Sequence, residues 1–124
     1  MGTQQSRATV ERYVELVASG TAAQILELYA PEAVVEDPIG SEPRRGLEAI
    51  RELYAVLEPL QRKAEATTIR VSGNHAAVAF TMVSEGHGHR MTISPVDIME
   101  FDDEGRILSM RAYWSQDDLQ VEQL

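Results

Sequence analysis

The sequence predicts an α+β domain in which three N-terminal helices pack on one face of a curved, mostly antiparallel sheet. Apolar residues recur at helical spacing in the first half of the chain, and the second half consists of strand-like runs separated by turn signals. Helices that precede strands in this way are typical of the α+β class. With 124 residues the chain has room for one hydrophobic core, so we expect a single domain over residues 1–124.

Each of the three predicted helices carries one apolar stripe and has a recognisable end. The first stripe, which ends at Gly20, consists of Val10, Tyr13, Val14 and Val17. Thr21 and Gln24 form a capping box for a short second helix, which ends before Pro31. Its apolar residues are Ile25, Leu28 and Tyr29. The third stripe, which ends at Pro59, consists of Ile50, Leu53, Tyr54 and Leu57.

The remaining segments are predicted to form strands, turns and one loop. A short strand covers 33–37, and a loop rich in proline and glycine follows it to residue 46. The later strands are predicted at 65–71, 75–83, 90–101 and 106–114, with turn residues between them, as in an antiparallel meander. The polar tail after Trp114 is expected to fray.

Composition excludes several classes of function. Eleven Lys and Arg against 20 Asp and Glu give a formal net charge of −9, which disfavours binding to nucleic acid or to an anionic membrane. Cysteine is absent, which excludes thiol nucleophiles and thiolate metal sites. The first residues lack the apolar stretch of a signal peptide, so we expect a cytoplasmic protein. Carboxylates, tyrosines and hydroxyls remain to carry any chemistry.

Asp97 is the most unusual residue because its neighbours of the same strand parity are all apolar: Ile93, Pro95, Met99 and Phe101. If that face is buried, the carboxyl is expected to stay protonated and to act as a hydrogen-bond donor. The other interpretations are that the face is exposed or that Asp97 pairs with an arginine.

Asp37 is predicted at the end of a strand, where Pro38 keeps it extended. A carboxylate at the rim of a pocket can act as a general base, although such an Asp more often caps a turn. Tyr13, Tyr29 and Tyr54 each lie on the stripe of a predicted helix. They could form a network of hydroxyl groups, or they could be three independent core tyrosines.

Two other motifs are better explained without a functional role. His87 and His89 have the spacing of metal ligands on a strand, but they flank a glycine at a hairpin tip and have no third ligand nearby, so we predict no metal site. Arg44 and Arg45 are interpreted as a solvated pair in the loop.

Four segments together resemble bacterial ketosteroid isomerase: the helix around residues 12–16, Val35-Glu36-Asp37-Pro38-Ile39-Gly40, Pro95-Val96-Asp97 and residues 110–114. The resemblance implies the cone-shaped nuclear-transport-factor-two-like (cystatin-like) fold, no cofactor and a homodimer. It implies that the substrate is a 3-oxo-Δ5-steroid whose double bond moves into conjugation through a dienolate. It also implies that Asp37 is the base and that Tyr13 and a neutral Asp97 stabilise the oxyanion, a role in which a protonated aspartate is known for this family.

In one branch of this family, tyrosines at the positions of Tyr29 and Tyr54 hydrogen-bond to the oxyanion tyrosine, whereas the loop at 40–44 resembles the other branch. An apolar pocket for a flat polycyclic ligand is predicted from nine side chains: Val14, Val17, Val78, Phe80, Met82, Met99, Phe101, Met110 and Trp114. Two alternatives stay open on the same fold: a polyketide cyclase-like enzyme, and a non-catalytic domain that binds lipid or mediates dimerisation. An epoxide hydrolase of this fold is disfavoured because no arginine is predicted to point inward beside two aspartates.

Overall fold

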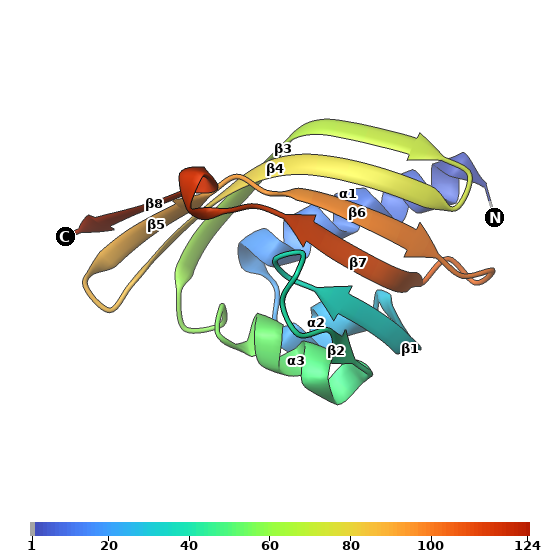
Figure 1. Cartoon of the computed structure of the whole chain (residues 1–124), viewed down its shortest axis with the longest axis horizontal. Coiled ribbons are helices and arrows are strands. Elements are labelled where there is room, and N and C mark those ends of the chain that lie inside the picture. Colours follow the sequence, from blue (N-terminus) through green and yellow to red (C-terminus); the bar gives the residue numbers. More distant parts are fainter. Residues whose placement is uncertain (1) are drawn as a thin grey trace.

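The computed structural model describes residues 2–124, and its helices lie on one face of a single curved sheet (Figure 1). The helical segments are α1 (Thr3–Ser19), α2 (Ala22–Leu26), α3 (Leu47–Ala55) and the 3-10 turn η1 (Gln116–Asp118). The strands are β1 (Tyr29–Glu36), β2 (Arg44–Arg45), β3 (Gln61–Ser72), β4 (His75–Gly86), β5 (His89–Ile93), β6 (Val96–Phe101), β7 (Ile107–Tyr113) and β8 (Leu119–Gln123). The predicted fold class is therefore confirmed.

The sheet runs in the order β2-β1-β7-β6-β4-β5-β8, and β3 pairs with the other edge of β4. The pairing of β1 with β7 is parallel, and the remaining pairings in the described part of the chain are antiparallel. Strand β4 pairs with β6 through residues 75–79 and with β5 through residues 82–86. The sheet therefore divides along β4, and Figure 1 shows β5 and β8 projecting away from the helices.

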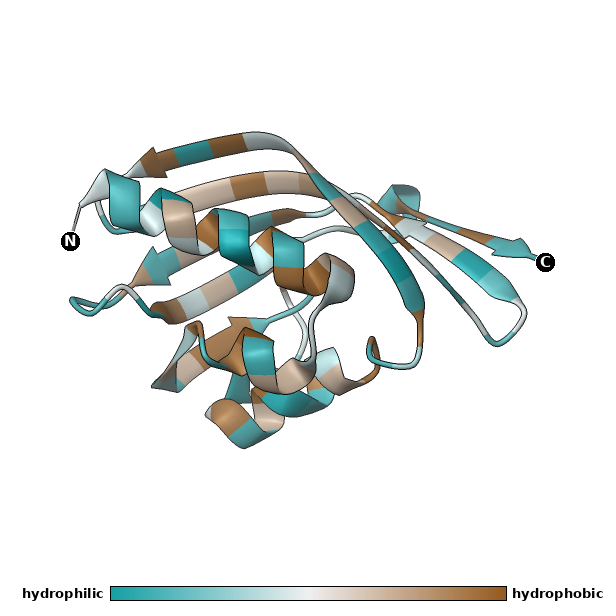
Figure 2. Cartoon of the chain, turned by 180° about the vertical axis from the view of Figure 1, so that it is seen from behind, coloured by the Kyte–Doolittle hydropathy of each residue, from teal (hydrophilic) through white to brown (hydrophobic). Residues whose placement is uncertain are grey.

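Helix α1 lies along the sheet (Figure 2). The predicted stripe is confirmed, since Val10, Tyr13, Val14 and Val17 are all buried. The C-terminal end of α1 is capped by Arg62 of β3, which donates hydrogen bonds to the carbonyl oxygens of Val17 (2.8 Å) and Gly20 (2.6 Å). A cation at this end of a helix also favours the helix dipole.

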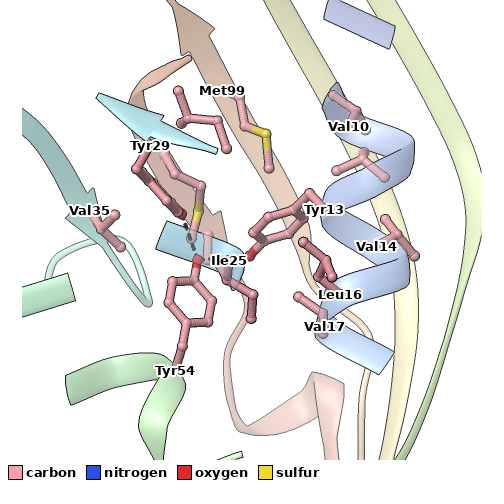
Figure 3. Packing of buried hydrophobic residues seen from close by; sticks show 14 of the residues in the cluster. Val10, Tyr13, Val14, Leu16, Val17, Ile25, Tyr29, Val35, Tyr54 and Met99 are labelled. Atoms are coloured by element: carbon pink, nitrogen blue, oxygen red, sulfur yellow. Dashed lines mark hydrogen bonds between the residues drawn. The ribbon is translucent and has the colours of Figure 1, made fainter. Parts of the chain in front are cut away.

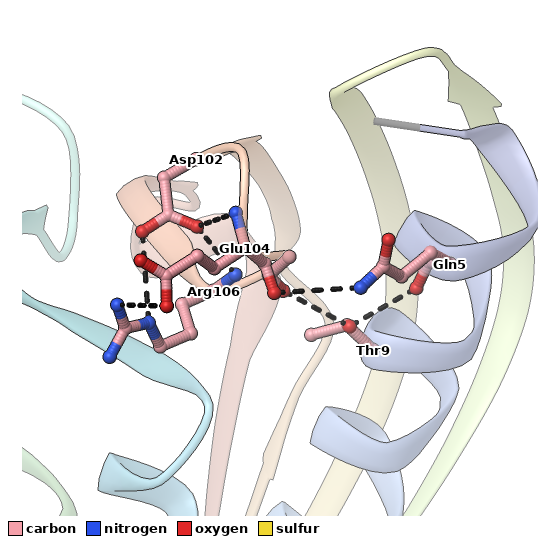
Figure 4. Close-up of polar contacts among 6 residues, drawn as sticks. Gln5, Thr9, Asp102, Glu104 and Arg106 are labelled. Carbon is pink, nitrogen blue, oxygen red and sulfur yellow. Dashed lines mark hydrogen bonds and ion pairs between the residues drawn. The ribbon is translucent and has the colours of Figure 1, made fainter.

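The N-terminal half of α1 is tied to the turn between β6 and β7 (Figure 4). Thr9 Oγ1 donates to the carbonyl oxygen of Gly105 at 3.3 Å, and Gln5 Nε2 donates to that of Glu104 at 3.5 Å. Asp102 Oδ1 accepts hydrogen bonds from the backbone N–H groups of Glu104 and Arg106, so the turn keeps its own shape. These contacts fix how α1 crosses the sheet, and thereby the direction in which Tyr13 points.

Two of the predicted boundaries in the first half were wrong. Tyr29 does not belong to the second helix: that helix ends at Leu26, and Tyr29 begins β1. The backbone explains this, because the N–H of Ile107 on β7 donates to the carbonyl oxygen of Leu28 and draws the chain into the sheet. Arg44 and Arg45 are not loop residues either, since they form β2 and pair with Val35 and Val34.

In the second half, the predicted strand over 90–101 divides at Ser94–Pro95 into β5 and β6. Proline has no N–H to donate to a neighbouring strand, and it sits at the break. The tail after Trp114 does not fray: η1 turns the chain, and β8 pairs with β5 along its whole length. Strands β3 and β4 are also longer than predicted, since β3 begins at Gln61 and β4 continues to Gly86.

Candidate active site

Three tyrosine hydroxyls form a continuous chain inside the core (Figure 3). Tyr13 comes from α1, Tyr54 from α3 and Tyr29 from the first residue of β1. The hydroxyl oxygens of Tyr13 and Tyr54 are 3.0 Å apart, and those of Tyr54 and Tyr29 are 2.5 Å apart. The geometry therefore favours the network over three independent core tyrosines.

Burial keeps these tyrosines protonated. Desolvation raises the pKa of each of the three hydroxyls well above the ordinary value, and the nearby Asp97 raises all three further. The hydrogen bond with Tyr54 acts the other way on Tyr13 and lowers its pKa, as expected when Tyr54 is the donor. When Tyr54 donates to Tyr13, the proton of the Tyr13 hydroxyl is available to a ligand.

Asp97 lies in the middle of β6 and points inward, with 2% of its surface exposed. Its parity partners Pro95, Met99 and Phe101 are buried on the same face, and Ile93 is half-buried, so the predicted apolar face exists. Its Oδ1 is buried and has no hydrogen-bond partner within residues 2–124. Desolvation, and secondarily the charge of Asp37, raise the pKa of Asp97 to about 8, while the Tyr13 hydroxyl lowers it in part. The group is therefore a neutral acid at pH 7 with polar capacity left for a ligand.

Asp37 directly follows β1, is only partly buried and is joined to Pro38 by a cis peptide bond. Trp114, which follows β7, donates from Nε1 to Asp37 Oδ1 at 2.6 Å. Desolvation raises the pKa of Asp37 above its usual value, whereas the Trp114 hydrogen bond and the charge of Arg44 lower it. Asp37 and Asp97 thus face one pocket from different environments. Different surroundings allow one carboxyl group to be ionised as a base while the other stays protonated as an acid.

Tyr13, Asp37 and Asp97 line the same apolar cavity, whose volume is about 150 Å³. Four of the nine predicted pocket residues line it: Val17, Phe80, Met82 and Trp114. The other five lie outside its lining, in the core: Val14, Val78, Met99, Phe101 and Met110. Their strand or helix parity was right, but they sit deeper along their elements than the cavity reaches.

Sequence reasoning missed six lining residues: Leu53, Val56, Leu57, Ile93, Pro95 and Ala112. Three of them come from α3 and the turn after it. Leu53 and Leu57 belong to the predicted apolar stripe of the third helix, which indicates core residues. Val56 has an exposed fraction of 64%, so it forms the mouth of the cavity. The signal that could have found them is Tyr54, because a helix that delivers a network tyrosine also brings its neighbours to the pocket.

Residues 2–124 contain neither a cluster of metal-ligand side chains nor a helix suited to cross a membrane. No three His, Asp or Glu side chains in this range come together as metal ligands would. His87 and His89 are exposed at the β4–β5 hairpin, where His89 Nδ1 lies 3.0 Å from the His87 carbonyl oxygen. None of the helices in the same range has the length and hydropathy to cross a membrane.

Helices packed on one face of a curved sheet, with the site in the cavity between them, define the nuclear-transport-factor-two-like class. Residues 10–110 match the SnoaL-like domain model, and the chain belongs to that family. The chain is 39% identical, over 93% of its length and 94% of the relative's, to a steroid Δ-isomerase of Nocardioides simplex. The resemblance inferred from the sequence is confirmed by this similarity.

Two further similarities concern enzymes of another kind. The chain is 30% identical over 85% of its length to the epoxide hydrolase LasB of Streptomyces lasalocidi, of which it covers 45%. The solved structure of the epoxide hydrolase/cyclase-like enzyme SalBIII superposes with a TM-score of 0.84 at 28% identity, over 96% of this chain and 97% of that one. SalBIII has a role in pyran ring formation in the polyether salinomycin.

Proposed function

We propose that this protein is a cofactor-independent steroid Δ-isomerase that converts a 3-oxo-Δ5-steroid into its conjugated isomer. The observation that carries the proposal is that an ionisable base, Asp37, and two neutral donors, Tyr13 and Asp97, line one apolar cavity. The similarity to a steroid Δ-isomerase over nearly the whole chain supports it.

The proposed reaction is an internal proton transfer. The Asp37 carboxylate takes a proton from the carbon between the ketone and the alkene, so that a C–H bond breaks and an O–H bond forms. The electron pair moves into a dienolate and places negative charge on the ketone oxygen. Protonated Asp37 then returns the proton two carbons further along, and the double bond is left in conjugation.

Tyr13 and Asp97 would donate hydrogen bonds to that oxygen as its charge grows. Donors that are already oriented in a site without water stabilise a transition state by several kcal/mol. Neither donor has to move, because Tyr13 is held by Tyr54 and Asp97 by its strand.

The cavity also constrains how a steroid would lie. Its volume of about 150 Å³ is smaller than the roughly 300–1,000 Å³ of most ligand pockets. We propose that the reacting rings enter the cavity and that the distal rings extend past Val56 at the mouth. Specificity for the distal part of the substrate would then be weak.

A homodimer in the cytoplasm is part of the proposal. Val96 and Tyr113 lie opposite one another on β6 and β7 with exposed fractions of 38% and 44%. Uncovered apolar pairs on the outer face of a sheet support association through that face. Light scattering on the purified protein should give twice the mass of one chain, and Tyr113→Glu should reduce it toward one.

The test of the proposed function is to mix the protein with a 3-oxo-Δ5-steroid and follow the ultraviolet absorbance of the conjugated enone. We expect catalysed formation of the enone, abolished by a competing planar phenol that mimics the dienolate. Absence of catalysis with several such steroids would contradict the proposal.

A second candidate function is epoxide opening, which the similarities to LasB and SalBIII favour. In this reaction Asp37 would accept the proton of an attacking hydroxyl or water, and Asp97 would give its proton to the epoxide oxygen as the C–O bond breaks. The variant Asp97→Asn separates the two functions. Asn still donates a hydrogen bond to an oxyanion but has no proton to transfer, so it should retain part of an isomerase activity and lose epoxide opening.

A further inference from the structure

A second cleft reaches Asp37 and shares no other lining residue with the apolar cavity. Its volume is about 380 Å³, and its other lining residues come from the segment after Asp37: Ser41, Glu42, Pro43, Arg44, Arg45 and Ala49. The carboxyl of Asp37 therefore stands between an apolar compartment and a polar one. The polar compartment holds the two arginines that the sequence suggested were merely solvated.

The two arginines are held very differently. Arg44 Nη1 donates a 3.1 Å hydrogen bond to the Ala49 carbonyl oxygen and lies 3.7 Å from Glu52 Oε2, with 37% of its side chain exposed. Strand β2 places Arg44 opposite Val35, two residues before Asp37. Arg45 is exposed and makes no hydrogen bond or ion pair through its side chain in the described structure. Only Arg44 is thus a fixed charge beside the base.

The charged and titratable groups around Asp37 come from every element packed against it. Tyr13 from α1, Tyr54 from α3 and Asp97 from β6 are neutral at pH 7, as their raised pKa values imply. Trp114 donates a hydrogen bond without carrying charge. In the cleft, Glu42 is an exposed carboxylate and Glu52 pairs with Arg44. Arg44 is therefore the anchored cation beside the carboxylate, and its charge lowers the pKa of Asp37.

We propose that Arg44 is a positioning residue for the base: its anchored guanidinium holds Asp37 as a carboxylate from the polar side, while the apolar cavity would otherwise favour the neutral acid. This inference rests on the proposed function of Asp37 as a base. It gives the two-residue edge strand β2 a role, since its pairing with β1 places the guanidinium beside the carboxylate.

The test compares two neutral variants, Arg44→Met and Arg44→Gln, with the charge-preserving Arg44→Lys. The matched control is Arg45→Met, which removes one positive charge from the neighbouring residue of the same strand and the same cleft. The pH profile of kcat/KM is measured for each, and 13C NMR of the Asp37 carboxyl, assigned with Asp37→Asn, reports the titration without any substrate.

We expect the acid limb of kcat/KM to move to higher pH in the neutral Arg44 variants, with a roughly threefold to tenfold loss at pH 5 relative to the wild type and an unchanged plateau. The NMR titration should move in the same direction. Arg44→Lys should restore most of the wild-type profile, and Arg45→Met should leave both readouts close to those of the wild type.

An equal shift in Arg44→Met and Arg45→Met would overturn the proposal, because it would show a general effect of net charge. No shift in either neutral Arg44 variant would overturn it as well. The NMR titration distinguishes this failure from that of the proposed function. A moved Asp37 titration in a protein that isomerises no steroid would uphold the role of Arg44 and refute the isomerase, since the carboxyl titrates whatever its substrate.

Discussion

The indole Nε1 of Trp114 donates a 2.6 Å hydrogen bond to Oδ1 of Asp37, which lies 77 residues earlier in the chain. The parallel pairing of β1 with β7 brings them together, because Asp37 and Trp114 are the residues that directly follow those two strands. An indole N–H can only donate, so the contact favours the carboxylate form of Asp37. It also fixes the orientation of the carboxyl group, which leaves the other oxygen as the one to meet a substrate.

We expect Asp37→Asn to lower kcat by about 10²–10⁴-fold, because the amide keeps the shape of the side chain and loses the basic oxygen. The measurement is the rate of enone formation at saturating steroid. The Trp114 hydrogen bond can be kept by the amide oxygen, which limits structural damage. Near wild-type turnover in this variant would show that another group is the base.

Tyr13→Phe should reduce kcat by roughly 10²–10³-fold and change KM little, because the hydroxyl gains strength only as charge develops on the ligand oxygen. Tyr54→Phe and Tyr29→Phe should cost progressively less, since they act on the oxygen only through Tyr13. Steady-state kinetics of the three variants give the comparison. An increase in KM at constant kcat for Tyr13→Phe would mean that the tyrosine only binds the substrate.

Replacement of Asp97 should lower activity in the order Asp, Asn, Ala. Asn retains a weaker donor at the same place, and Ala removes donation altogether. Carbon NMR or carbonyl-region infrared spectroscopy of the wild type, with and without a bound enolate mimic, checks the protonation state directly. An ionised Asp97 at pH 7 in both forms would contradict the donor role.

The pH dependence of kcat/KM should be bell-shaped. Activity falls on the acid side when Asp37, whose pKa is raised above its usual value, takes up a proton. It falls on the basic side as Asp97 loses its proton near pH 8, since the pKa of Asp97 is about 8. The Tyr13 hydroxyl does not set the basic limb, because burial raises its pKa well above the ordinary value. Asp97→Asn should remove the basic limb and leave the acid limb in place, which rate measurements from pH 4 to 10 would reveal.

Asp97 should also make the folded state less stable as pH rises. Its pKa is about 8 when folded against an ordinary 3.8, so unfolding releases a proton between these values and the free energy of unfolding falls with increasing pH. Each unit of pKa difference corresponds to about 1.4 kcal/mol. Chemical denaturation at pH 5, 7 and 9 should show this decline in the wild type and a flatter dependence in Asp97→Asn. Parallel curves for the two proteins would be the contrary result.

The sequence revealed the catalytic candidates better than it revealed their surroundings. Asp97 could be found because strand parity needs only the alternation of residues over positions 93–101. Tyr29 belongs to the hydroxyl network that the sequence allowed, but it lies in β1 and not in the predicted helix. A short apolar segment before Pro31 fits the end of a helix as well as the start of a strand. Arg44 could not be found at all, because its importance depends on a two-residue strand that pairs only after the loop has folded.

The tail shows the same limit. Between Leu119 and Gln123 the apolar residues are Leu119 and Val121, too few to signal a strand, yet β8 pairs fully with the open edge of β5. The backbone ladder with β5 and the 3.3 Å contact of Glu122 with Arg90 of β5 hold it in place, and both depend on a strand that is distant in the sequence. The pocket lining was half-right for a related reason: parity tells which face a residue occupies but not how far along the face the cavity extends.

A bound oxyanion would impose one direction of hydrogen-bond donation on the chain of three tyrosine hydroxyls. Each hydroxyl carries one proton, so if Tyr13 gives its proton to the ligand, Tyr54 must point to Tyr13 and Tyr29 must point to Tyr54. Without a ligand, the same oxygen positions are also compatible with the reversed sequence of protons, since either atom of each pair can donate. Charge appearing at one end would thus order protons up to two side chains away without moving a heavy atom. One set of oxygen positions in the core is therefore compatible with two opposite directions of hydrogen bonding.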